Sequence, residues 1–235
     1  MMVYGARADA RDLTTSVSVP TPTSGAGDRG GRRRGAVVRL LVQLMLVVGA
    51  SLLLGGATSF AQTFLPDALN SFANSASGWT LLTALVVGAC RARTVPSAVF
   101  GAASFVALVL GYQIVSGLRG FPTDETLFLI VSVIVGPFVG IAASWLHRNA
   151  WRVVAGGGIL AGIALGEGAY GLILVASTTG WFYWSVISVA GLGLLAVAVV
   201  YRLHTTRTRI AAIGLTFLVG AAFYVSYVAL GSVSL

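Results

Sequence analysis

Glu167 is the residue of this chain best placed to do chemistry, because it is the one acidic residue inside a long apolar run. An ionised carboxylate in hydrocarbon is costly, so such a residue usually faces the interior of a helix bundle or a wet cavity. Two roles follow from this placement. The carboxyl group either carries a proton or anchors a ligand, or it forms a hydrogen bond that ties two helices together.

Further polar residues are predicted near the depth of Glu167. With a rise of about 1.5 Å per residue, Tyr112, Gln113 and Tyr224 fall in the same outer half of the membrane, and Asn74 lies just above them. The inner halves of the apolar runs carry few polar residues. This distribution predicts a small outward-facing pocket in which Tyr112 and Gln113 orient a ligand beside Glu167. The alternative is that these side chains cap helix ends and bond to one another.

The elements that must position these residues are membrane-spanning helices. The apolar runs are about 20 residues long, the length of a helix that crosses about 30 Å of hydrocarbon, and they do not alternate in polarity as barrel strands do. We predict an all-α polytopic bundle of about seven spans within a single domain, residues 36–235, the second span being short. The predicted spans are residues 36–60, 75–90, 98–118, 126–146, 153–177, 181–203 and 210–230.

The arginines predict the orientation of these spans. All but one of the 15 basic residues, Arg119 being the exception, fall in the N-terminal tail or in alternate gaps between apolar runs. Cytoplasmic loops collect positive charge, so we predict the N-terminus inside and the C-terminus outside. The net charge of +8 is explained by this topology, and nucleic acid is not expected as a partner. Absence of lysine and abundance of Ala, Gly, Val and Arg indicate a GC-rich coding sequence, and therefore a bacterial plasma membrane.

Two segments lie outside the predicted spans. Residues 1–35 are rich in Ser, Thr, Pro, Gly and Arg without periodicity, and we expect a disordered cytoplasmic tail. Its basic end serves as a positive-inside anchor or as a contact with anionic lipid. Residues 65–76 have apolar positions at helical spacing, and Pro66 and Asp67 suit a helix start, so a short amphipathic helix is expected at the outer interface.

Small residues indicate which span is central. Gly158, Gly162 and Gly166 repeat every four residues, a spacing that lets helix backbones approach closely. The fifth span is therefore expected at the centre of the bundle. Gly136-Pro137 interrupts the fourth span and is expected to kink it.

Several classes of chemistry lack their motifs in this chain. The single cysteine, Cys90, excludes an internal disulfide and a cysteine-based metal cluster. No phosphate-binding loop, HExxH pair or nucleophile elbow is present, and neither histidine falls within a span. We therefore expect no catalytic residue, no cofactor and no metal, and a protein that is not an enzyme.

Short motifs across the chain resemble those of a known family. They are Gly56-Ala57-Thr58-Ser59, Gln62-Thr63, Leu65-Pro66, Asn74-Ser75, Gly78-Trp79, Gly136-Pro137 and Gly166-Glu167-Gly168. Together they resemble a family of small multi-span bacterial membrane proteins classed as a domain of unknown function, over roughly residues 36–230. The resemblance implies an integral membrane protein and assigns no activity. A compact bundle with an outward pocket is also similar in architecture to the substrate-binding subunits of vitamin-uptake transporters.

Two functional hypotheses remain open at this point. The first is a transporter-like or small-ligand-binding protein of the cell membrane, with its pocket around Glu167. The alternative is a structural or accessory subunit whose small-residue helices pack on a membrane partner or on another copy of the chain. Both hypotheses place the protein in the lipid bilayer.

Overall fold

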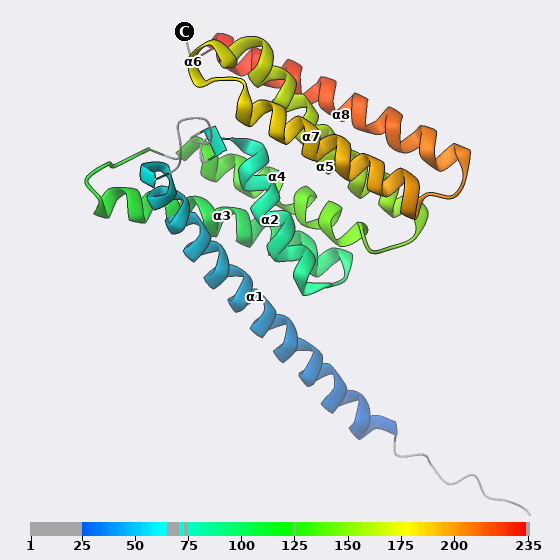
Figure 1. The fold of residues 1–235 in the computed structure, drawn as a ribbon. Helices are drawn as coiled ribbons and strands as arrows, with labels where there is room; N and C mark the ends of the chain where they lie inside the picture. Colours follow the sequence, from blue (N-terminus) through cyan, green and yellow to red (C-terminus); the bar gives the residue numbers. More distant parts are fainter. Residues whose placement is uncertain (1–24, 65–70, 73–74, 125, 234–235) are drawn as a thin grey trace, which may run out of the picture. The chain divides into compact units, whose positions relative to one another are not determined.

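The computed structural model describes residues 25–64, 71–72, 75–124 and 126–233. Throughout these residues the secondary structure is helical, without a strand (Figure 1). The chain divides into two compact units, Met1–Val38 and Arg39–Leu235. The helix contacts described below lie within the larger unit.

The helices follow the chain order of the predicted spans closely. The long helices are α1 (Gly25–Phe64), α2 (Ala76–Cys90), α3 (Thr94–Leu118), α4 (Thr126–Trp145), α5 (Ala150–Tyr170), α7 (Phe182–Val197) and α8 (Thr206–Val233). A π-helical turn, η2 (Gly171–Val175), and a short α6 (Ala176–Thr179) extend α5, and a second π-helical turn, η3 (Ala198–Arg202), extends α7. Single π-helical turns inside longer helices are frequent at functional sites.

Six of the described helical segments are long and apolar enough to cross a membrane. They correspond to α1, α3, α4, α5 with its extension, α7 with η3, and α8. Helix α2 is the predicted second span, but its 15 residues reach only about 22 Å, less than the roughly 30 Å of a hydrocarbon core. The all-helical class is thus confirmed with six membrane-length helices, and the orientation stays a prediction.

Several helices begin earlier than predicted: α3 begins at Thr94 and not at residue 98, and α8 begins at Thr206 and not at residue 210. Helix α1 begins at Gly25, ahead of the predicted start at residue 36. The first 24 residues of the predicted tail lie outside the described residues. Most of the predicted amphipathic helix, residues 65–70 and 73–74, also lies outside them, and within it Ser71 and Phe72 form a 3₁₀ turn.

Helix α5 is the central helix of the second half of the chain, as its glycines predict. It packs against α4, α7 and α8, and more lightly against α2. A Cβ atom added at Gly162 would lie 2.6 Å from the Val219 Cβ of α8, and one at Gly158 would lie 2.9 Å from the Leu215 side chain. A Cβ atom at Gly162 would also lie 2.8 Å from the Thr216 carbonyl oxygen of α8, so a side chain there would push the two backbones apart. The glycines therefore allow α5 and α8 to approach closely.

Hydroxyl pairs and an apolar cluster hold the first half of the bundle. The Ser51 and Ser104 hydroxyls of α1 and α3 are 2.8 Å apart, and so are those of Ser59 and Ser116. Between α2, α3 and α4 the apolar cluster contains Trp79, Phe105, Leu108, Val109 and Tyr112. Helix α4 continues through Pro137. This packing holds α2, although it is the shortest of the long helices, against α3 and α4.

Candidate functional site

The N-terminus of α2 receives the side chain of Glu167 from α5. The Ala76 amide donates to Glu167 Oε1 at 2.8 Å, and the Ser77 amide donates to Oε2 at 2.6 Å. The first amides of a helix have no partner within the helix, and a negative charge is favourable at this end of the helix dipole. Glu167 is therefore a cap for α2 that comes from another helix.

Two further side chains complete this cap. Ser75 is the N-cap residue of α2, and its hydroxyl accepts the Gly78 amide at 2.9 Å. The same hydroxyl donates to Glu167 Oε2 at 3.4 Å and forms a hydrogen bond with the Tyr183 hydroxyl of α7. The first three amides of α2 thus all have side-chain acceptors, and α2, α5 and α7 are joined through one buried network.

The network explains how a carboxylate is tolerated at this depth. Glu167 is only 1% exposed, and burial of such a group is unfavourable unless its oxygens are hydrogen-bonded. Here both carboxylate oxygens accept backbone N–H groups. The geometry matches the interpretation in which Glu167 ties helices together. A ligand-binding or proton-carrying role of this residue stays a prediction.

The other predicted site residues make their contacts away from Glu167. The Tyr112 hydroxyl donates to Gln62 Oε1 at 3.0 Å, and its ring packs edge-on against Trp79. Gln113 Nε2 donates to the Thr123 carbonyl at 3.3 Å. The Tyr224 ring packs against Tyr170. Asn74 lies outside the described residues. The structure thus gives Glu167 a different set of neighbours from the predicted one.

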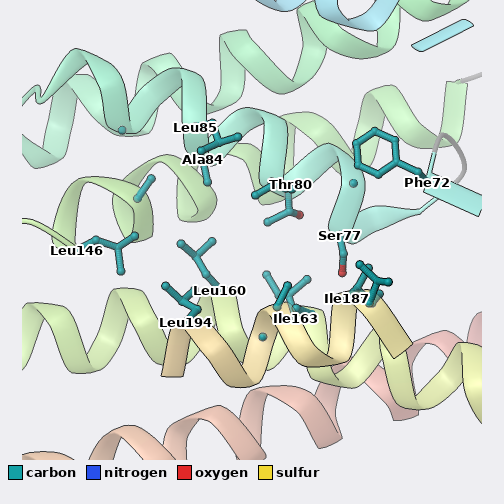
Figure 2. Close-up of a pocket in the computed structure, with 18 of the residues that line it drawn as sticks. Phe72, Ser77, Thr80, Ala84, Leu85, Leu146, Leu160, Ile163, Ile187 and Leu194 are labelled. Carbon is teal, nitrogen blue, oxygen red and sulfur yellow. The ribbon is translucent and has the colours of Figure 1, made fainter. Parts of the chain in front are cut away.

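A separate cavity of about 860 Å³ is lined by α2, α5 and α7 and by residues at the C-terminal end of α4 (Figure 2). We call this cavity the apolar groove. Figure 2 shows α2 on one side and the apolar side chains of α5 and α7 on the other. Its main apolar lining residues are Leu81, Leu85, Leu160, Ile163, Ile187 and Leu194. The groove follows α2 from Ser77, beside the Glu167 cap, to Arg91 at the opposite end of the helix.

Small side chains keep the groove open. Ala84 of α2, Ala164 of α5, and Ala190 and Gly191 of α7 all line it. Larger apolar residues at these four positions would fill the space. Helices α5 and α7 pack against each other, whereas α2 meets α5 only lightly. Because protein interiors are normally packed as densely as organic crystals, a cavity of this size between α2 and the α5–α7 pair is a specific feature of the fold.

The Arg91 end of the groove opens beside a polar cavity of about 410 Å³, which we call the basic pocket. Gly88, Arg91 and His147 line both cavities, and Arg148 and Arg202 complete the charged lining of the basic pocket. No acidic side chain is among the described residues that line it. The basic pocket therefore presents three guanidinium groups without a carboxylate to balance them.

Two of these arginines are held in place by backbone carbonyls. Arg148 Nη2 donates to the Ala92 carbonyl at 3.1 Å, and Arg202 Nη2 donates to the Arg148 carbonyl at 3.4 Å. Each guanidinium has five N–H donors, so most donors remain for another partner. Arg202 ends the π-helical turn η3, which brings it to the pocket from the end of α7.

Arg91 has an unusual backbone conformation. It caps the C-terminus of α2 with φ of 47°, and it is the one non-glycine residue at positive φ among those described. This left-handed conformation costs roughly 1–2 kcal/mol for residues other than glycine, and helices that end in it usually do so with glycine. An arginine stands here although glycine would suit the backbone better.

The groove and the basic pocket were missed by sequence reasoning. Arg91, Arg148 and Arg202 were assigned to topology alone, because arginines at one side of a membrane are expected there. The signal that was available is the shortness of the second span together with its small residues. Within the described residues, no group of three His, Cys, Asp or Glu side chains is placed to hold a metal ion.

Comparison with known proteins places the chain in a family without assigning a function. Neither the curated proteins nor the solved structures contain a match to it. A family of unknown function (DUF6518) matches residues 34–232, which include all the helices around the groove. The predicted resemblance to an uncharacterised family is thereby confirmed, and the chain belongs to the family of unknown function DUF6518.

Proposed function

We propose that this protein is an integral membrane protein that binds an apolar or amphiphilic small molecule in the apolar groove. The observation that carries the proposal is the cavity of about 860 Å³ between α2, α5 and α7. Its size falls within the roughly 300–1,000 Å³ of small-molecule sites, which are mostly apolar and have a few polar groups that fix orientation. This groove is a different site from the predicted pocket around Glu167, which stays a prediction.

The dimensions of the groove suit a hydrocarbon chain. Its α2 lining extends from Ser77 to Arg91, which at 1.5 Å per residue is about 20 Å. One leaflet of a bilayer has about 15 Å of hydrocarbon. An extended alkyl chain of membrane length therefore fits along α2. The Ser77 and Tyr183 side chains lie at one end of it, and Arg91 and His147 lie at the other.

The Glu167 cap supports this proposal in a structural role. It fixes the N-terminus of α2 to α5 through the Ala76 and Ser77 amides. The Ser75–Tyr183 hydrogen bond fixes the same end to α7. These contacts set the spacing between the groove walls, because α2 and α7 form its two sides.

The proposal is tested by mapping an alkyl probe on the full chain. A long-chain alkyl diazirine is photolysed with the detergent-purified protein, and the labelled peptides are identified by mass spectrometry. We expect label on Leu81, Leu85, Ile163 and Ile187. Ala190→Phe, which fills the groove from α7, should reduce this label at least several-fold, because the aromatic ring occupies the same space.

Ala196→Phe is the matched control, since Ala196 is also exposed on α7 and does not line the groove. It should leave the labelling unchanged. Equal labelling of the groove in wild type and Ala190→Phe would contradict the proposal. Label spread evenly over the outward faces of the helices, without enrichment in the groove, would favour the accessory-subunit hypothesis.

A further inference from the structure

We propose that the ligand is an anionic phospholipid of the bilayer, with its phosphate in the basic pocket and one acyl chain in the apolar groove. This inference rests on the proposed function, because it names the occupant of the same groove. It goes further in assigning a headgroup site to Arg91, Arg148 and Arg202, which no motif or family comparison indicates.

Charge complementarity identifies the headgroup. The basic pocket is lined by three arginines and a histidine, and no carboxylate is among its described lining residues. The planar guanidinium group binds phosphate through paired N–H donors, and such charge-assisted hydrogen bonds are stronger than neutral ones. A neutral apolar molecule would leave these donors unused. An anionic phosphate would use them.

The two cavities share lining residues at the place where a lipid headgroup would meet its acyl chain. Gly88, Arg91 and His147 line both of them, so the headgroup position passes directly into the start of the groove. From there the lining is apolar along α2 as far as Thr80. A charged end followed by a long apolar path is the pattern of an amphiphile, and it is continuous here.

Arg91 is the one of the three arginines that lines both cavities, and its backbone conformation supports a binding role. Its left-handed conformation is unfavourable for arginine, and residues held in such conformations cluster at ligand sites. Within the described part of the chain, no hydrogen bond or ion pair engages its guanidinium group. Its side chain therefore lines the junction of the two cavities without a protein partner that would account for it.

The predicted topology places this pocket on a suitable membrane surface. Arg91 and Arg148 lie in loops that the positive-inside rule assigns to the cytoplasmic side. The cytoplasmic leaflet carries anionic lipids, which basic pockets between helices can bind. The site differs from the basic end of the N-terminal tail, because it is formed by three separate helix ends with a groove attached.

The test uses the full chain, stripped of lipid in a neutral detergent, and three lipids with identical acyl chains. These are phosphatidylglycerol, phosphatidylcholine and diacylglycerol, and binding is followed by native mass spectrometry and by the unfolding midpoint. We expect phosphatidylglycerol to bind the wild type roughly tenfold more tightly than diacylglycerol, as a charged hydrogen bond implies. Arg91→Asn should remove most of that preference, and Arg91→Lys should keep part of it.

Asparagine is chosen because it tolerates the left-handed conformation. Arg207→Asn is the matched control, since it removes the same charge on the same predicted side, outside both cavities. Arg202→Gln is a second variant in case Arg91→Asn does not fold. It should also weaken phosphatidylglycerol binding more than diacylglycerol binding.

The outcomes separate the two proposals. If none of the three lipids binds, both the groove function and this inference are wrong. If all three bind equally and Arg91→Asn and Arg202→Gln change nothing, the groove binds apolar chains and only the headgroup assignment is overturned. If Arg207→Asn weakens binding as much as Arg91→Asn, overall charge explains the preference, and the assignment to the basic pocket is likewise overturned.

Discussion

The two ends of helix α2 carry charged groups in opposite circumstances. At its N-terminus Glu167 is almost fully buried, and both of its oxygens accept backbone amides. At its C-terminus Arg91 is exposed, and it holds a left-handed backbone conformation at the junction of two cavities. The Glu167 carboxylate is hydrogen-bonded within the protein, whereas the Arg91 guanidinium lines the two cavities.

This difference separates a structural charge from a candidate functional one. A buried ionisable residue in a membrane helix suggests a functional hypothesis. The hydrogen bonds of Glu167 to the first amides of α2 offer a structural reason for its presence instead, because they stabilise that helix end. An arginine in a loop is ordinarily explained by topology. The backbone of Arg91 and the cavities beside it are not explained in that way. Burial alone therefore does not decide which of the two charges serves a function.

The largest effect is expected for Glu167→Leu. Leucine leaves the half-buried Ala76 amide and the buried Ser77 amide without acceptors, and each unsatisfied group costs about 1–3 kcal/mol. We expect a loss of roughly 3 kcal/mol or more in the free energy of unfolding, measured by thermal unfolding of the detergent-purified protein. An unchanged or higher midpoint would show that the carboxylate is kept at a cost to stability, and would restore the hypothesis that it serves a ligand or a proton.

Asp124 provides the exposed counterpart of that cap. Its Oδ1 accepts the Thr126 hydroxyl at 2.6 Å and the Thr126 amide at 3.1 Å at the start of α4. These hydrogen bonds lower the pKa of Asp124, the one from the hydroxyl having the larger effect. The carboxyl group is therefore ionised at neutral pH. Its contribution to stability is lost only as the pH falls through that lowered pKa. Asp124→Asn should therefore lower the midpoint much less than Glu167→Leu.

A smaller loss is expected for Ser75→Ala. This change removes the acceptor of the Gly78 amide and the hydrogen bond to Tyr183, while the two amides bound by Glu167 keep their partner. Loss of an N-cap side chain costs about 0.5–2 kcal/mol. The same unfolding measurement checks it. A loss as large as that of Glu167→Leu would mean that the carboxylate depends on Ser75 for its position.

Tyr183→Phe should have a smaller effect still. Phenylalanine keeps the ring packing against Trp184 and Phe72 and removes only the hydroxyl that bonds Ser75. We expect about 1 kcal/mol, the net value of a typical hydrogen bond. In a double-mutant cycle with Ser75→Ala, the two losses should not add, because both changes remove the same bond.

At the other end of α2, Arg91→Gly should leave stability nearly unchanged. Glycine adopts the left-handed conformation without the penalty of roughly 1–2 kcal/mol that arginine carries there. Glycine also loses more conformational entropy on folding, which costs about 0.5–1 kcal/mol and offsets most of that gain. Lipid preference should fall as it does for Arg91→Asn. A clear drop in the unfolding midpoint would place Arg91 among the structural residues and remove the contrast between the two ends.

Several features of the fold followed from local patterns in the sequence. Apolar runs of membrane length predicted the helices, because hydrocarbon permits few other backbone conformations. The spacing of Gly158, Gly162 and Gly166 predicted the close approach of α5 to another helix, which proved to be α8. These patterns depend on residues close together in the chain, so a single sequence contains them.

The arrangement of the site depends on long-range pairing, and it was predicted less well. Glu167 was identified, but its partners Ser75 to Ser77 lie about ninety residues away in the chain. Matching of depth suggested Tyr112 and Gln113 instead, because depth does not tell which face of a helix meets which neighbour. The groove arises from small residues on three helices, and no local pattern marks the space between them.

The most direct test is a cryo-electron microscopy map of the protein in nanodiscs that contain phosphatidylglycerol. We expect elongated density along α2 between Leu85 and Ile163, continuous with headgroup density against Arg91 and Arg148. We also expect the Glu167 carboxylate to lie at the Ala76 and Ser77 amides. A map in which side chains close the groove, or in which ordered lipid is bound only on the outward faces of the helices, would contradict these expectations.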